Sequence, residues 1–316
     1  MIEILRPGLL TTVQDGGRRG FQAFGVPVCG AMDWHALAVA NLLAGNTWEE
    51  AALEVTALGP MIRFCKDAVF AIAGADFSAQ LSGVPLPANG AFFAHEGDIL
   101  EMNAAKGGFR SYLAVSGGFD IPVFLSSRST CLSAHFGGFQ GRALQKGDQI
   151  PLRAPQLWLK GLPKRFLDVA PCESRPLRVV LGPQHAAFSE EGLNTFFSAE
   201  YKLGKDCDRM GCRAEGPAIK LRDGVTPNIL SDGVAMGSIQ VPNGQPIIMM
   251  ADRQTTGGYV KLGTVISADL PLLAQKRPGD TVRFTCVSVQ EAHAALRRSR
   301  RKLLALEAEW NRGDLW

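Results

Sequence analysis

One short pattern, Gly-Asp followed by alternating residues, occurs three times in the chain and constrains the fold most strongly. The three copies begin at Gly97, Gly147 and Gly279. A Gly-Asp pair is typical of a tight turn, and the period-two alternation after it is typical of a strand with one buried face. The 35 glycines and 18 prolines also indicate many turns between short strands. We therefore expect a mainly β fold, built as an antiparallel barrel or sandwich.

Four further runs of apolar or alternating residues predict strands: 68–73, 111–115, 177–181 and 238–241. Helices are expected to be few. Asp33 is expected to cap a helix that ends near Gly45, and residues 189–199 form a weaker candidate that Gly192 interrupts. A last helix is expected at about 290–310, where apolar residues recur at helical spacing.

The length of 316 residues exceeds that of one typical domain, so two domains are expected. Residues 155–176 contain four prolines and little alternation, which is typical of a connecting segment. We therefore predict an N-terminal β-barrel domain over 1–154 and a C-terminal β-barrel domain with a terminal helix over 177–316. The two halves share too little sequence to establish a repeat.

Composition excludes several classes of function. The net charge of +3 is too small to indicate a nucleic-acid or membrane surface. The seven cysteines are scattered, and no CxxC pair occurs, which argues against a zinc site and a disulfide framework. No secretory signal and no run of 18 apolar residues is found. We expect a soluble protein in the reduced cytoplasm.

The common local motifs of enzymes are absent. The sequence has no P-loop, no GxGxxG, no HExxH and no GxSxG. Its five histidines lie far apart without ligand spacing, so each is expected to be a surface or packing residue rather than a ligand. No metal site is predicted, and catalysis would depend on a site that these motifs do not describe.

The segment from Asp252 to Lys261 is the richest in polar groups. It lies between the apolar runs 246–250 and 262–266, so we predict a hairpin with this segment at its tip. The candidate catalytic residues here are Asp252, Gln254, Thr255 and Thr256, with Lys261 as a substrate-binding residue. Clustered amide and hydroxyl groups can stabilise charge on a ligand, although an elaborate turn would look similar.

Other polar clusters supply further substrate-binding candidates. Gln14 and Arg18 lie in a glycine-containing segment whose backbone could approach an anion, or which could be a simple hairpin turn. Arg128 lies among serines and threonines that suit a carboxylate or phosphate, or that form a polar loop. Arg209 could bind an anion or form a structural salt bridge. Gln240 is at a strand end, just before an Asn-Gly hairpin pattern.

Several motifs together resemble the KipA-like family, also called allophanate hydrolase subunit 2, biotin-dependent carboxyltransferase-like proteins, or the C component of the bacterial ATP-dependent 5-oxoprolinase. The resemblance covers nearly the whole chain, in order. The motifs that carry it are residues 11–18, 30–33, 40–46, 53–56, 112–118, 127–130, 209–211, 240–242 and 252–259. The chain departs from the family pattern at Ser126, where glycine is usual, and at Cys131, where aspartate is usual.

The resemblance implies two cyclophilin-like β-barrel domains with few helices and a C-terminal helix. It also implies one subunit of a complex with a KipI-like subunit (the B component) and a LamB/YcsF-like subunit (the A component), which opens 5-oxoproline to glutamate at the expense of ATP. ATP would be shared with or bound by the partner subunits. Asp252, Gln254, Thr255 and Thr256 would then act at the amide, where Asp252 could be a general base, and Gln240 would recognise it. Arg209 and Lys261 would meet a carboxylate or phosphate.

Two other functions stay open. A carboxyltransferase subunit of the urea carboxylase type would need biotin on another chain, because no biotin-acceptor sequence is present. A non-enzymatic protein that sequesters a KipI-like inhibitor would need only an interface, for which the basic run 297–302 is a candidate. That run could equally be a solvated helix face.

Overall fold

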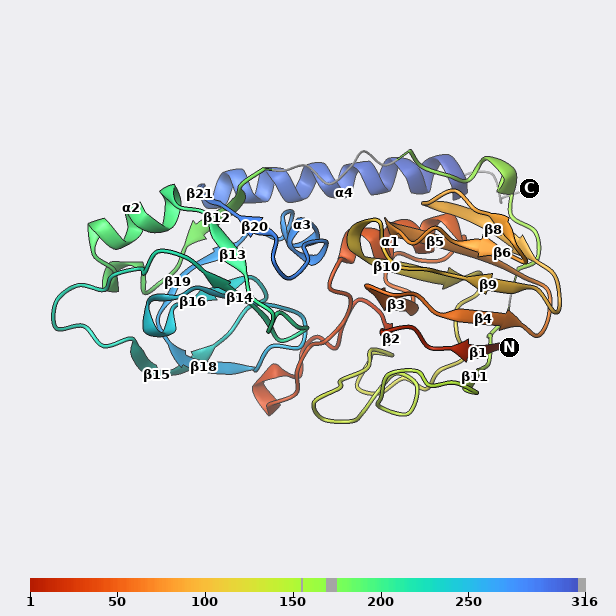
Figure 1. Cartoon of the computed structure of the whole chain (residues 1–316), viewed down its shortest axis with the longest axis horizontal. Coiled ribbons are helices and arrows are strands. Elements are labelled where there is room, and N and C mark those ends of the chain that lie inside the picture. Colours follow the sequence, from red (N-terminus) through yellow and green to blue (C-terminus); the bar gives the residue numbers. More distant parts are fainter. Residues whose placement is uncertain (155, 169–174, 312–316) are drawn as a thin grey trace. The chain divides into compact units, whose positions relative to one another are not determined.

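The computed structural model describes residues 1–154, 156–168 and 175–311 (Figure 1). The chain is mainly β, with four α-helices in these residues, which confirms the predicted fold class. Contacts between Cα atoms divide it into two compact units. The first comprises Met1–Arg18, Cys29–Cys172 and Arg301–Trp316, and the second comprises Arg19–Val28 and Glu173–Arg300. The predicted domains over 1–154 and 177–316 stay a prediction. The division by contacts differs from them in assigning 19–28 to the second unit and 301–316 to the first.

The first unit contains two antiparallel sheets. The six-stranded sheet has the order β11 (Gln149–Ile150), β1 (Ile2–Arg6), β4 (Met61–Phe64), β9 (Ile99–Glu101), β6 (Gln80–Leu81) and β7 (Val84–Pro85). The five-stranded sheet has the order β2 (Leu10–Gln14), β3 (Ala52–Thr56), β10 (Gly107–Val115), β5 (Ala68–Asp76) and β8 (Gly90–Ala94).

Alternating side chains of both sheets form one apolar core. Ile4 and Phe64 from the six-stranded sheet belong to the same buried cluster as Leu53 and Phe70 from the five-stranded sheet. Helix α1 (Trp34–Leu43) covers the other face of the five-stranded sheet, where alanines of β5 allow a close approach. As predicted, Asp33 caps this helix, and its carboxylate accepts a hydrogen bond from the Ala36 N–H.

The second unit is built on one eight-stranded sheet. Its order is β20 (Thr281–Val282), β13 (Tyr201–Leu203), β14 (Gly211–Glu215), β17 (Ile247–Met249), β16 (Ser238–Gln240), β19 (Lys261–Val265), β12 (Leu177–Leu181) and β21 (Phe284–Cys286). Strands β12 and β21 pair in parallel, a departure from the all-antiparallel prediction. Strands β15 (Asn228–Gly233) and β18 (Thr256–Tyr259) form a separate two-stranded ribbon (Figure 1).

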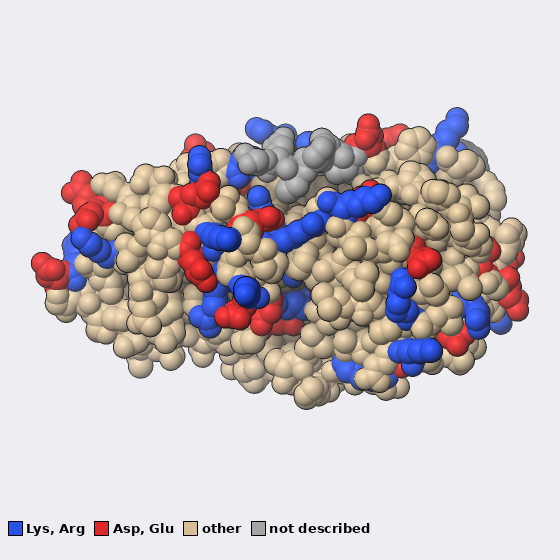
Figure 2. All heavy atoms as spheres, in the orientation of Figure 1, with Lys and Arg blue, Asp and Glu red and all other residues tan. Residues whose placement is uncertain are grey.

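Helices α2 (Glu190–Ser198), α3 (Leu270–Ala274) and α4 (Val289–Asn311) complete the fold, with 3-10 turns at Gln22–Phe24, Leu162–Lys164, His185–Ala187 and Pro242–Gly244. Gly192 lies inside α2 and does not break it. A Cβ at this position would lie 2.2 Å from the Lys220 carbonyl oxygen, so the close approach of that segment requires glycine. Within the residues described, none of the helices is both long and apolar enough to cross a membrane. On the face shown in Figure 2, basic and acidic side chains are interspersed.

The three Gly-Asp copies have one geometry, as predicted. Each glycine has a left-handed φ of 90° to 95°, and a strand begins directly after each aspartate. Each aspartate carboxylate accepts a hydrogen bond from the N–H three residues earlier: His95 to Asp98, Gln145 to Asp148, and Arg277 to Asp280. The side chain therefore closes the turn that aims the strand.

The predicted hairpin with 252–261 at its tip is wrong. Strands β17 and β19 do not pair, because β16 lies between them in the sheet. The Asn-Gly turn joins β16 to β17, with Asn243 in the left-handed region at φ 50°. The polar segment then leaves the sheet and forms β18, which pairs with β15. Strand pairing across the chain has outweighed the local turn pattern.

A buried carboxylate fixes the first strand of the second unit. The Asp269 side chain is inaccessible to solvent and accepts hydrogen bonds from Arg175 and from the backbone and guanidinium of Arg178. Burial raises the pKa of the Asp269 carboxyl, but the hydrogen bonds from Arg178 and Arg175 outweigh burial and hold the pKa below its usual value.

We predict that Asp269→Asn lowers the free energy of unfolding near neutral pH by about 1–3 kcal/mol. Because the pKa is lowered in the folded state, this stabilisation is present above the carboxyl's unfolded pKa of about 4 and is lost as pH falls through the folded pKa. Urea unfolding of both proteins from neutral to acid pH measures it. Asp223→Asn, at an exposed aspartate, is the control. A difference that does not shrink in acid would contradict the prediction.

Candidate functional site

In the first unit, the carboxylate of Asp15 joins two of the predicted clusters. It accepts hydrogen bonds from the hydroxyls of Ser127 and Ser129 and from the N–H groups of Gly17 and Arg128. Asp15 and Ser127 are 112 positions apart in the sequence. Four donors hold this nearly buried carboxylate in one position, so Asp15 ties the Gly17 turn to the 127–130 segment.

Arg18 is fully buried and serves the same loop. Its guanidinium donates to the carbonyl oxygens of Phe124 and Ser129 and lies 4.8 Å from the centroid of the Phe136 ring. Gly137, at φ 67°, is required beneath it, since a Cβ there would lie 2.7 Å from the guanidinium. In this arrangement Nε and Nη2 hold a loop, while Nη1 is buried without a hydrogen-bond partner among the described residues, so a substrate-binding role for Arg18 stays a prediction.

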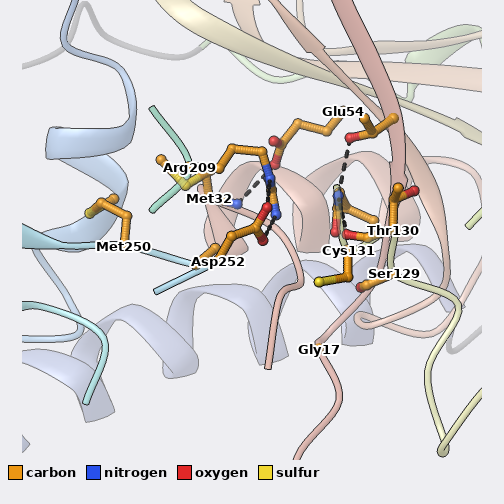
Figure 3. Close-up of polar contacts among 12 residues, drawn as sticks. Gly17, Met32, Glu54, Ser129, Thr130, Cys131, Arg209, Met250 and Asp252 are labelled. Atoms are coloured by element: carbon orange, nitrogen blue, oxygen red, sulfur yellow. Dashed lines mark hydrogen bonds and ion pairs between the residues drawn. The ribbon is translucent and has the colours of Figure 1, made fainter. Parts of the chain in front are cut away.

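Gln14 and Arg128 lie in the same cluster, with different exposure. The Gln14 amide donates to Thr12 and to the Thr130 carbonyl oxygen, and its own oxygen is buried without a hydrogen-bond partner among the described residues. The Arg128 guanidinium donates to the Ile121 carbonyl oxygen and lies 3.8 Å from Glu50. The structure thus brings Gln14, Arg18 and Arg128 around one loop. Figure 3 labels Ser129, Thr130 and Cys131 of this loop.

The two departures from the family pattern lie in this loop. Ser126 has φ 62°, a conformation that glycine adopts without strain, which explains why glycine is usual there. Cys131 is buried, and its backbone pairs with Phe136 while its sulfur lies 3.6 Å from the Ser133 hydroxyl. A buried thiol therefore stands where the resemblance leads us to expect an aspartate.

Glu54 and Tyr112 form a buried pair; both lie in motifs that carry the family resemblance, but neither is a predicted site residue. The Tyr112 hydroxyl donates to the Glu54 carboxylate and accepts from the Asp33 N–H. The Met32 N–H also donates to Glu54 (Figure 3). Burial, followed by the charges of Glu54 and Asp33, raises the pKa of Tyr112 well above its usual value. The available sequence signal was a glutamate inside the apolar strand 52–56.

In the second unit, Arg209 and Asp252 form a two-pronged ion pair. The guanidinium Nε and Nη2 lie 2.9 and 2.8 Å from the two carboxylate oxygens, and the two side chains are only 4% and 5% exposed (Figure 3). The Asp252 N–H also donates to the Arg209 carbonyl oxygen. Both oxygens of Asp252 are engaged, so the carboxylate acts as a structural acceptor in this arrangement.

After the buried Arg253, the residues Gln254, Thr255 and Thr256 present polar groups to solvent. Gln254 and Thr255 are half-buried and Thr256 is exposed. Their side chains make no hydrogen bond with any residue that the structure describes. One amide and two hydroxyls are therefore available to a ligand, next to the rigid ion pair that precedes them.

Gln240 and Lys261 lie opposite each other on β16 and β19, so their side chains share one face of the sheet. Both are buried. The Lys261 ammonium lies 3.4 Å from Asp232 of the ribbon, and the Gln240 Nε2 has no hydrogen-bond partner within the described ranges. The structure brings these two predicted substrate-binding residues together. Among the described residues, no three His, Cys, Asp or Glu side chains converge as a metal site would need.

Comparison with known proteins decides the family. The family model for the carboxyltransferase domain, subdomain A and B, matches residues 24–286. The chain belongs to this carboxyltransferase-domain family. It is 41% identical to the C component of the 5-oxoprolinase of Haemophilus influenzae over 94% of both chains, and 37% identical to that of Escherichia coli over 92% of this chain and 93% of that one.

The solved structure of the Kluyveromyces lactis urea amidolyase shows the same fold. It matches with a TM-score of 0.88 and 31% identity, over 96% of this chain. This carboxyltransferase-domain chain spans only about a fifth of that much longer protein. The predicted family is confirmed, and its members include both enzyme subunits and a domain of a large enzyme.

We predict that Asp252→Asn lowers the free energy of unfolding by about 3–5 kcal/mol, because it removes the carboxylate that accepts two hydrogen bonds from the buried Arg209 guanidinium. Arg209→Met combined with Asp252→Leu should recover much of the loss. Urea unfolding measures both. Glu191→Gln, which breaks the exposed Lys220–Glu191 pair, is the control and should cost at most about 1 kcal/mol. Equal losses in Asp252→Asn and the control would contradict a structural role.

Proposed function

We propose that this chain is the C component of a multi-subunit, ATP-dependent 5-oxoprolinase, which hydrolyses the amide ring of 5-oxoproline to glutamate. The observation that carries the proposal is the match with the Haemophilus influenzae C component over 94% of both chains. The matches with urea amidolyases cover only about 17% of those proteins. A chain that aligns with nearly the whole of a subunit is best explained as that subunit.

The chemistry of ring opening supports a role for the segment after Asp252. Addition of water to the ring carbonyl places negative charge on its oxygen before the C–N bond breaks, and hydrogen-bond donors stabilise that charge. Gln254, Thr255 and Thr256 have donors that no described residue uses. In this proposal they face the amide, while the Arg209–Asp252 pair holds the segment and Asp252 does not act as a general base.

The nucleotide fits better on a partner than on this chain. Helix N-termini commonly bind phosphates, but the N-termini of α1, α2 and α4 carry Asp33, Glu190 and Glu291. These carboxylates would repel a phosphate, so we assign ATP to the KipI-like subunit or to the LamB/YcsF-like subunit. The assembly with these two partners, a cytoplasmic location and a cyclophilin-like barrel fold are parts of the same proposal.

Carboxyl transfer is the second candidate, favoured by the fold shared with urea amidolyase. Biotin would then be carried by another chain, and the same donors would stabilise charge on a urea-like carbonyl. Sequestration of a KipI-like inhibitor is the remaining alternative. Purified chain mixed with the candidate partners separates the three: ATP-dependent glutamate release, carboxylation with free biotin, or partner binding alone.

We predict that, in the reconstituted complex, Thr255→Ala combined with Gln254→Ala lowers kcat for glutamate release about 10²- to 10³-fold, because donors to the developing oxyanion are lost. Thr281→Ala is the matched control, at an exposed strand threonine outside the segment 252–261, and it should leave kcat unchanged. Unchanged glutamate release in the double variant would remove this segment from the site. Absence of any 5-oxoproline-dependent ATP hydrolysis in the wild-type complex would overturn the proposed function itself.

A further inference from the structure

Two pairs of residues face each other where the ribbon meets the sheet of the second unit. Gln240 and Lys261 are direct partners on β16 and β19. Asp232 and Gly257 are direct partners on β15 and β18. Asp232 contacts Lys261, and Gly257 lies against Gln240. The Asp232–Gly257 pair of the ribbon therefore covers the Gln240–Lys261 pair of the sheet.

Lys261 is a buried cation with a weak counter-ion. Its side chain is 6% exposed, whereas the side chain of Asp232 is 62% exposed. Among the described residues, the only ion pair of the ammonium is this 3.4 Å contact, although an ammonium has three N–H donors. A buried charge is stable only with good partners, so this position favours a closer anion than Asp232 supplies.

Gln240 offers a second donor at the same place. Its Nε2 is enclosed and has no hydrogen-bond partner in the part of the chain that the structure describes, and burying such a group is unfavourable. Gly257 is the residue that covers it, since a Cβ there would lie 2.3 Å from Nε2. The amide is therefore covered by glycine backbone, which a small displacement of β18 would remove.

The cover is a separate element. Among the described strands, β15 and β18 pair only with each other, and most of β15 is exposed, with Leu230 at 93%. Backbone hydrogen bonds from Val234 to Thr255 and from Val260 to Pro227 close the two ends of the ribbon. A two-stranded ribbon that is not part of the main sheet is only marginally stable by itself and can open at little cost.

We propose that Lys261 and Gln240 bind a carboxylate group of a small ligand, and that Asp232 occupies the carboxylate position until the ligand displaces it. The ligand carboxylate would accept hydrogen bonds from the Lys261 ammonium and the Gln240 amide, and the ribbon would close over it through Gly257. The identity of the ligand as 5-oxoproline rests on the proposed function, while the preference for a carboxylate rests on the two donors.

One ammonium and one neutral amide match the single charge of a carboxylate better than the higher charge of a phosphate. Phosphate sites usually combine guanidinium groups or several backbone N–H groups. The guanidiniums of the neighbouring polar segment are already engaged: Arg209 holds Asp252, and Arg253 donates to the carbonyl oxygens of Val234 and Met250.

The test measures binding to the full-length chain, by NMR of the Gln side-chain amides and by calorimetry, with 5-oxoproline and its primary carboxamide as probes. We expect the carboxylate to bind about 10- to 100-fold more tightly than the carboxamide, as for hydrogen bonds to a charged group. Lys261→Met should abolish this preference, and a buried methionine in place of lysine is expected to fold. Lys220→Met, at an exposed and paired lysine, is the matched control.

Asp232→Asn gives the sharper result. Removing a competing carboxylate should tighten 5-oxoproline binding several-fold, whereas a merely structural Asp232 would leave affinity unchanged or weaken it. Either of those two results, or equal affinity of the wild-type chain for acid and amide, would overturn the proposal. Acetate separates this proposal from the proposed function: acetate binding that needs Lys261 supports the site even if the reconstituted complex has no 5-oxoprolinase activity.

Discussion

The buried ion pair between Arg209 and Asp252 determines how the polar segment of the second unit is presented. Two hydrogen bonds join the guanidinium to both carboxylate oxygens, and the Asp252 N–H donates to the Arg209 carbonyl oxygen. The start of β14 and the end of β17 are thereby joined at one point. Gln254 and the residues that follow leave the sheet from a rigid position, which gives their polar side chains a defined direction.

In the first unit, a different set of groups holds a polar loop in one position. Asp15 is surrounded by hydroxyl and backbone donors, and Arg18 by carbonyl oxygens and aromatic rings. These contacts involve no side chain of opposite charge, yet both residues are nearly or fully buried. Such groups specify one loop conformation, because each would be strongly unfavourable without its partners. Asp15 and Arg18 therefore help to hold this loop, and a substrate-binding role for Arg18 stays a prediction.

Local patterns in the sequence predicted most elements, and long-range pairing decided the rest. The Gly-Asp turns and the Asp33 cap depend on neighbours within three residues, so the sequence alone predicts them. The wrong hairpin and the Asp15–Ser129 contact depend on which distant segments meet, 114 residues apart in the second case. A residue type does not reveal burial either: Glu54 in an apolar strand and Arg18 in a glycine-containing segment are both buried charged residues.

The second unit contains two cation–carboxylate pairs around one polar segment, and their contrast separates scaffold from exchangeable contact. Arg209 and Asp252 are both buried and joined at two points, so separating them would break two charged hydrogen bonds in a buried place. Lys261 is equally buried, but its partner Asp232 is largely in water and joined at one long contact. Water can solvate Asp232 when it leaves, so only the lysine needs a replacement anion. A ligand that supplies one gains the stabilisation that the resting pair lacks, and the ribbon that carries Asp232 is the element free to move.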